Sequence, residues 1–222
     1  MRKKLLKLYD DLYAEYGELN WWPAETQFEI IIGAILGQAT AWGNAAKAIN
    51  NLKAADLLNP EGMSKLSQEE LETLILPSGY YRAKAKKVRA FLTHLQEHHS
   101  NQLDSLFAQE LPSLREELLS IYGIGEETAD SILLYAAKKP SFVVDTYTYR
   151  LMGRLGWFSG RFHYGRLRGV FMDNLPHDRQ MFNQYHALIV RHGARVCQKT
   201  PRCEKCMLRT QCPTGSESGI HQ

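Results

Sequence analysis

Two helical patterns meet at a pair of glycines within residues 112–150, and this stretch constrains the fold more than any other part of the 222-residue chain. The first pattern ends at Gly123 and the second begins after Gly125, which predicts two short helices joined by a Gly-Ile-Gly turn. Glycines at both ends of the turn allow positive φ angles and a close approach of the backbone to a ligand. The NH groups at the start of the second helix can then bind an anion such as phosphate. Taken alone, the pattern is more typical of a plain helical hairpin without a ligand.

A carboxylate follows this hairpin at the start of the next helix. A short apolar run over 142–144 precedes Asp145, and helical spacing resumes with Tyr149 and Leu151. Asp145 is therefore predicted at a helix N-terminus, where its ordinary role is an N-cap worth about 1 kcal/mol. The alternative is a functional carboxylate beside an anion-binding hairpin.

Helical spacing dominates the rest of the chain and strand signals are sparse, which predicts an all-α protein. We expect helices over residues 1–17, 43–53, 67–75, 82–97, 165–173 and 178–192, a buried helix through residues 28–36, and a helix from Asp145 to residue 155. A hydrophobic content of 44% supports a real core. With no run of 18 apolar residues and no secretory leader pattern, we expect a soluble cytoplasmic protein without a membrane partner.

Basic residues gather in two segments, although the net charge of +3 is too small to prove a polyanionic partner. Residues 82–89 hold five basic residues and no acid, among them Arg82, Lys84 and Lys86. Residues 191–209 hold six basic residues against one glutamate. Either segment could be an ordinary solvated face, but two of them beside a phosphate-type hairpin favour DNA.

All four cysteines of the chain lie close together near its C-terminus. They are Cys197, Cys203, Cys206 and Cys212, in the spacing C-x5-C-x2-C-x5-C. Such clustering predicts a metal centre, either an iron-sulfur cluster or a zinc ion. Zinc is the weaker alternative, because structural zinc sites commonly pair two close-spaced knuckles and this segment has only one.

The hairpin region resembles a known family. The pattern LxxIxGIGxxTADxxLLYA followed by VVDTYTYR is similar to the helix-hairpin-helix and Gly/Pro-Asp signature of the endonuclease III superfamily of DNA glycosylases, and the similarity extends over residues 5–212. It implies a helical domain of residues 23–132 with the hairpin, a second of residues 1–22 plus 133–222, and a DNA-binding cleft between them. It also implies that Asp145 is catalytic and that residues 197–212 hold a 4Fe-4S cluster, although the family's first cysteine gap is one residue longer.

The resemblance assigns DNA contacts as well. Gln38 matches the residue that fills the space around an extruded nucleotide, although a glutamine at a helix end is usually just solvated. Tyr80 matches the residue that inserts into the duplex, and a surface tyrosine packed on a loop is an equally good interpretation. The hairpin glycines Gly123 and Gly125 are expected to face the phosphates.

Two departures within the family indicate the type of reaction. Members that cut the DNA backbone use a lysine on the second hairpin helix to form a Schiff base, and Glu127 stands at that position. This favours simple hydrolysis without AP lyase activity. The residues Trp21, Trp22, Pro23 and Trp42 resemble the pocket of the 3-methyladenine subgroup, where indoles attract a cationic alkylated purine. The tryptophans could also be core packing.

The sequence thus predicts a monofunctional DNA glycosylase for alkylated purines, acting as a nucleoid-associated monomer on double-stranded DNA with a damaged base. One alternative is a glycosylase for oxidised pyrimidines or mispaired bases. Another is a DNA-binding protein without catalysis, in which Asp145 is only a cap.

Overall fold

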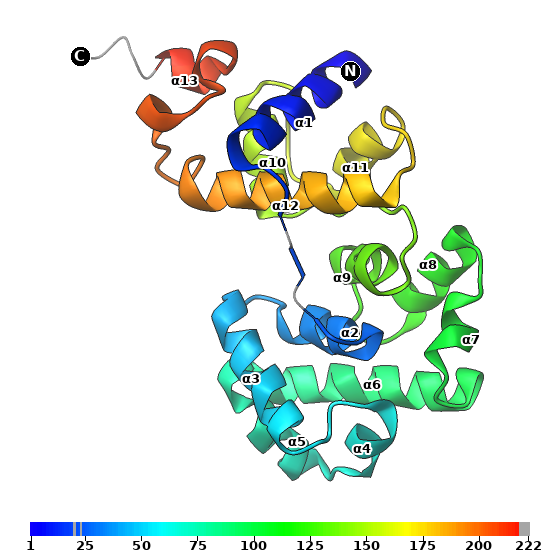
Figure 1. Cartoon of the computed structure of the whole chain (residues 1–222). Coiled ribbons are helices and arrows are strands. Elements are labelled where there is room, and N and C mark those ends of the chain that lie inside the picture. The colour runs from blue at the N-terminus through cyan, green and yellow to red at the C-terminus, as the bar shows by residue number, and fades with distance from the viewer. Residues whose placement is uncertain (20, 23, 218–222) are drawn as a thin grey trace. The chain divides into compact units, whose positions relative to one another are not determined.

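The chain divides into two compact units (Figure 1). The structure is a computed structural model that describes residues 1–19, 21–22 and 24–217, and within these ranges every regular element is a helix, which confirms the all-α class. Unit 1 combines Met1–Trp21 with Pro140–Gln222, and unit 2 is Trp22–Lys139. The predicted boundary after residue 132 falls inside a continuous helical segment. Leu133 and Ala136, which follow that boundary, still belong to the core of unit 2. None of the described helices has the length and apolar character needed to cross a membrane.

Unit 2 is built around α2 (Gln27–Leu36), which is apolar on nearly all sides. Thr26 begins this helix by accepting a hydrogen bond from the Glu29 NH at 3.1 Å. The buried stripe of α6 (Tyr81–His99) packs against it, with Val88 and Phe91 fully buried. The same core is completed by α3 (Trp42–Ala54), α4 (Pro60–Lys65), α5 (Gln68–Ile75), η1 (Leu76–Ser78) and α7 (Leu103–Phe107).

The predicted helical hairpin closes unit 2. It consists of α8 (Leu111–Ser120), a turn, and α9 (Glu126–Ser131), which continues into a π-helical segment η2 (Ile132–Ala136). Arg115 on α8 pairs with the buried Asp130 on α9 through two contacts, Nε to Oδ1 at 3.0 Å and Nη2 to Oδ2 at 3.1 Å. This two-point pairing fixes the angle between the two helices.

Unit 1 is organised around α12 (Arg179–Arg195), the long orange helix of Figure 1. The helices α1 (Arg2–Tyr16) and α10 (Thr146–Arg154) pack against it. Tyr185 on α12 is fully buried and its hydroxyl donates to the Leu5 carbonyl at 2.8 Å. An aromatic group of Phe142, Phe171, Phe182 and Tyr185 fills the core. The remaining elements are α11 (Tyr164–Met172), η3 (Cys203–Lys205), η4 (Arg209–Gln211) and α13 (Pro213–Glu217).

Candidate functional site

The two glycines of the hairpin turn differ in what they contribute. Gly123 has a φ of 86°, and a Cβ added there would lie 2.2 Å from the Lys87 Cγ, so both the backbone angle and the covering side chain require glycine. Gly125 has a φ of −89° and is the N-cap of α9. The positive φ expected at Gly125 is therefore wrong, because an N-cap takes an extended conformation that any residue can adopt. A Cβ at Gly125 would meet nothing within 4 Å, which leaves the start of α9 uncovered.

Gln38 is bound to this hairpin. Its Nε2 donates to the Gly123 carbonyl at 3.0 Å and to the Thr128 hydroxyl at 2.9 Å. Its Oε1 accepts from the Lys87 ammonium. The side chain therefore holds the turn, the start of α9 and α6 together, and a role beside an extruded nucleotide remains a prediction.

Tyr80 protrudes from the loop between η1 and α6. Its side chain is 75% exposed, and its backbone is left-handed with a φ of 47°. A non-glycine residue in this region carries a conformational cost, and such strain often marks functional loops. The geometry therefore suits the predicted inserting residue better than a tyrosine packed on the surface.

The prediction that Lys84 contacts DNA is wrong. Its side chain is buried, and its ammonium donates to the Leu36 carbonyl at 2.8 Å and to the Ser78 carbonyl at 2.7 Å. Burial and the charge of Lys87 lower the Lys84 pKa to about 8. Lys84 thus anchors the loop that carries Tyr80 and presents no ammonium to DNA. Arg82 and Lys86, by contrast, are exposed on the same helix.

Asp145 lies at the N-terminus of α10, as predicted. Its Oδ1 accepts hydrogen bonds from the Thr148 NH at 2.8 Å and the Thr148 hydroxyl at 2.9 Å. Its Oδ2 lies 3.5 Å from His186 Nε2, and the side chain is 13% exposed. Burial raises the pKa of this carboxyl, but the interaction with His186 and the two bonds from Thr148 outweigh it, so the net shift is downward. The carboxylate is therefore ionised at neutral pH.

Sequence reasoning missed His186. This histidine lies on α12, is itself buried, and contacts the Trp21 ring edge-on with the centroids 6.0 Å apart. It lies four residues after the buried Phe182 and three before the buried Ile189, so helical spacing already places it on the buried face of α12. Trp21 belongs to the same unit as Asp145 and His186.

Trp22 and Trp42, which were also predicted in the pocket, lie in unit 2. The rings of Trp22 and Trp42 meet edge-on with centroids 5.4 Å apart, and the Tyr135 ring centroid lies 4.8 Å from that of Trp22. Trp42 is 46% exposed, so it is not a core residue. Trp22, Trp42 and Glu29 line a cavity that the Lys53 side chain also borders. Pro23 lies outside the described residues.

Glu127 is exposed in the first turn of α9. The Ser131 hydroxyl donates to its carbonyl at 2.8 Å, an ordinary contact within the helix. At this position, where the resemblance implies a lysine in members that cut the DNA backbone, the chain has an exposed glutamate.

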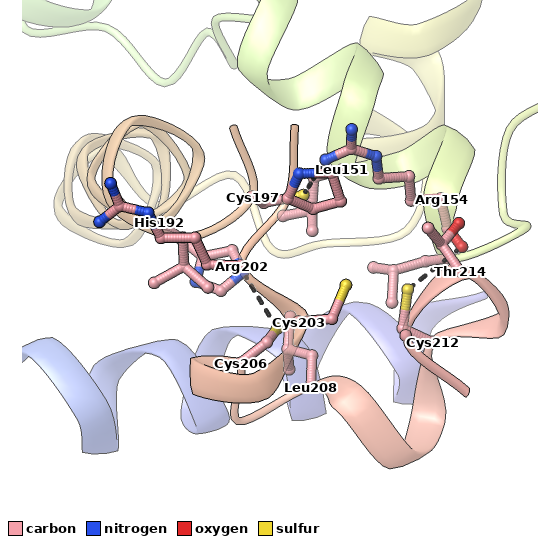
Figure 2. A pocket seen from close by; sticks show the side chains of 14 residues that line it. Leu151, Arg154, His192, Cys197, Arg202, Cys203, Cys206, Leu208, Cys212 and Thr214 are labelled. Carbon is pink, nitrogen blue, oxygen red and sulfur yellow. Dashed lines mark hydrogen bonds between the residues drawn. The ribbon is translucent and has the colours of Figure 1, made fainter. Parts of the chain in front are cut away.

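The four cysteines line one cavity in unit 1, and none of them is in a disulfide (Figure 2). Its other walls include apolar side chains from α10 and from the loop itself: Leu151, Leu155, Val196 and Leu208. The Arg154 guanidinium donates to Cys197 Sγ at 3.1 Å, and His192 Nε2 lies 3.6 Å from Cys206 Sγ. A purely thiol donor set, an apolar shell and NH groups directed at sulfur are the conditions under which thiolates hold a metal centre.

The same helix that begins at Asp145 is tied to the cysteine loop at its other end. Arg150 donates to the carbonyls of Cys197 at 2.7 Å and Gly193 at 3.0 Å. Arg154 donates to the carbonyls of Gln198 at 2.7 Å and Lys199 at 2.8 Å. The position of α10 therefore depends on the loop that the cysteines would organise around a metal.

Comparison with known proteins identifies the family. The profile of the HhH-GPD superfamily of base excision DNA repair proteins matches residues 32–176. The chain belongs to this family. A putative DNA repair glycosylase of Methanocaldococcus jannaschii is 43% identical over 209 residues, which cover 94% of this chain and 95% of the relative. Endonuclease III of Thermotoga maritima is 31% identical over 186 residues, covering 83% and 82%.

Among solved structures, that of the H. pylori 3-methyladenine DNA glycosylase bound to 1,N6-ethenoadenine has a TM-score of 0.68 to this chain. It is 27% identical and covers 86% of this chain and 94% of its own. Together these matches confirm the resemblance to the endonuclease III superfamily. This HhH-GPD protein is a DNA glycosylase of the endonuclease III type, and DNA is its substrate.

Proposed function

We propose that this glycosylase is monofunctional and hydrolyses the N-glycosidic bond of an alkylated purine such as 3-methyladenine. The observation that carries the proposal is that the two carboxylate oxygens of Asp145 have different partners. One oxygen caps α10 through Thr148, and the other, 3.5 Å from His186 Nε2, would act on the substrate. The N-cap role and the catalytic role are therefore compatible, which weakens the interpretation of the chain as a DNA-binding protein without catalysis.

The chemistry needs only a carboxylate and a water molecule. The base leaves with the electron pair of the glycosidic bond, and the negative Asp145 stabilises the positive charge that develops on the sugar. Water then supplies the hydroxyl to the sugar carbon, and Asp145 takes up the released proton. A base that is already cationic leaves as a neutral molecule, so no catalytic acid is required.

Glu127 supports hydrolysis without strand cleavage. A carboxylate cannot form an imine with the sugar, so the step that leads to lyase activity has no nucleophile at this position. This distinguishes the proposed reaction from that of family members with a lysine there.

The aromatic residues of unit 2 support an alkylated purine as the substrate. Trp22, Trp42 and Tyr135 form a group of rings, and indole faces attract a cation by about 1 to 2 kcal/mol. Glu29 borders the same cavity, where its carboxylate pairs with the Lys53 ammonium at 2.9 Å. The structural relative from H. pylori is a 3-methyladenine glycosylase.

We further propose that Cys197, Cys203, Cys206 and Cys212 hold a 4Fe-4S cluster, with zinc as the less favoured alternative. When bound, such a cluster supplies a rigid cross-link among the four sulfurs and a redox-capable centre. The surrounding residues fit it, because Arg154 and His192 direct nitrogen atoms at the sulfurs and several apolar side chains complete the walls. The exposed Lys199, Arg202 and Lys205 make the loop a candidate DNA contact.

The proposed DNA contacts are the hairpin turn at Gly123 and Gly125, the protruding Tyr80, and the exposed Arg82 and Lys86. Gln38 would support the turn. The enzyme would act on double-stranded DNA as a monomer in the cytoplasm, at the nucleoid.

A panel of duplexes tests the proposal. Each carries one lesion, either 3-methyladenine, 1,N6-ethenoadenine, an oxidised pyrimidine or a mispaired base, and released base is measured with and without alkali. We expect release of the alkylated purines and an intact strand until alkali is added. Release of oxidised pyrimidines alone would favour the second substrate class, and no release from any duplex would reject the proposed substrates.

A further inference from the structure

Two histidines and a glutamate that have no part in the proposed reaction converge in unit 2. His94 and His99 lie on the last turns of α6, and Glu117 lies on α8 (Figure 1). The Oε1 atom of Glu117 is 2.7 Å from His94 Nε2 and 2.5 Å from His99 Nε2. The three side chains are only 17%, 10% and 20% exposed, respectively. Their ligand atoms all lie within 4.8 Å of one another.

Neighbouring side chains orient this group. The Ser105 hydroxyl lies 3.0 Å from His99 Nδ1, and Gln109 Nε2 donates to the other carboxylate oxygen of Glu117. A hydroxyl can donate to Nδ1 or accept from it, so His99 can present Nε2 either with or without its hydrogen. Such outer contacts are typical of residues that hold metal ligands in place.

We propose that His94, His99 and Glu117 bind a divalent first-row transition metal, with Zn²⁺ as the best match. Two imidazole nitrogens and one carboxylate oxygen form a common zinc set, with the fourth position left to water. Zinc bonds of about 2.0 to 2.2 Å place tetrahedral ligand atoms roughly 3.3 Å apart. The observed separations of 2.7 and 2.5 Å therefore need to widen by less than 1 Å, within reach of side-chain rotation.

A metal at this position would join α6 to α8, the first helix of the helical hairpin. It would thus stabilise α8 against α6, in addition to the Arg115–Asp130 pair that joins α8 to α9. The competing interpretation is a metal-free network in which histidines and Glu117 only exchange hydrogen bonds.

Zinc binding to the full-length protein with its iron centre intact decides between these interpretations. We expect one Zn²⁺ per chain in addition to unchanged iron, measured by elemental analysis after dialysis, and a higher Tm in the presence of Zn²⁺. In Glu117→Gln the zinc affinity should fall by more than about 100-fold, since loss of an outer partner alone costs 10- to 100-fold. Glu116→Gln is the matched control, because it makes the same change at an exposed neighbour on α8 and should bind zinc like the unmodified protein.

His99→Gln provides a second variant in case Glu117→Gln folds poorly. The glutamine amide can still donate to Glu117 but cannot replace the imidazole as a ligand, so it should keep the fold and lose the zinc. Equal zinc affinity in His99→Gln and the unmodified protein would overturn the proposal. Absence of zinc from the unmodified protein, or zinc that displaces iron from the cysteines, would overturn it as well.

Discussion

At the scale of single residues, the capping role of Asp145 and its proposed catalytic role belong to different oxygens of one carboxylate. Oδ1 receives both hydrogen bonds from Thr148, while Oδ2 lies 3.5 Å from His186. Replacement by asparagine keeps a cap of similar strength and removes the charge. The two roles can therefore be measured apart.

We expect Asp145→Asn to slow base release by at least about 100-fold, because stabilisation of the developing cation is lost. Its free energy of unfolding should fall only by the loss of the interaction with His186, since asparagine caps helices as well as aspartate does. Single-turnover rates and urea titrations measure the two effects. An undiminished rate would mean that the carboxylate is only a helix cap.

Glu127 provides a second test, of whether the protein lacks a Schiff-base nucleophile. The unmodified protein should leave an intact abasic strand, and borohydride should trap no covalent adduct. Glu127→Lys should yield trapped complex, because an amine on the first turn of α9 can attack the sugar carbon. Glu126→Lys is the matched control, since it makes the same charge change one residue earlier in the same turn. Efficient trapping by the unmodified protein would show that another amine already reaches the sugar.

At the scale of helices, Lys84 shows how one buried cation fixes a loop. It links the end of α2 to Ser78, just before Tyr80. Its pKa in the folded state is about 8, below the ordinary value of 10.5. Between these two pH values the unfolded chain holds a proton that the folded chain has lost. The stability contributed by this residue therefore increases as pH rises.

Between pH 8 and pH 10.5, we expect the free energy of unfolding of the unmodified protein to rise more than that of Lys84→Met. The difference between the two increases should be at most about 3 kcal/mol. Urea titrations across this range provide the measurement. Lys86→Met on the same helix controls for the loss of an exposed lysine, and its pH profile should follow that of the unmodified protein. Parallel profiles for all three proteins would contradict the burial of the Lys84 charge.

The same helices indicate what sequence can and cannot predict. Long apolar stripes located α1, α2, α6 and α12, whereas α4 and α7 were missed because five or six residues are too short to establish a period. The π-helical turn of η2 could not be predicted, because its apolar composition is also that of an α-helix. Lys84 lies four residues before the buried Val88, so its burial was visible in the pattern. The convergence of His94 and His99 on Glu117 was not visible in the sequence, since only the fold brings α6 and α8 together.

At the scale of the whole molecule, we expect the two units to depend differently on the proposed metal centre. All four cysteines and the helix that begins at Asp145 belong to unit 1, whereas the helical hairpin belongs to unit 2. Arg150 and Arg154 connect α10 to the carbonyls of the cysteine loop. Loss of the metal should therefore affect catalysis through α10 and leave the hairpin intact.

We expect chelation of the proposed iron centre to increase amide hydrogen exchange in α10 and in residues 197–212, because the loop would lose its cross-link and with it the acceptors of Arg150 and Arg154. The amides of α2 and α6 should keep their protection, which makes unit 2 an internal reference within the same sample. Base release should fall together with the protection of α10, since Asp145 begins that helix. An equal loss of protection in both units would show that the centre supports the whole chain, and unchanged exchange in α10 would show that its two arginines hold the loop without any metal.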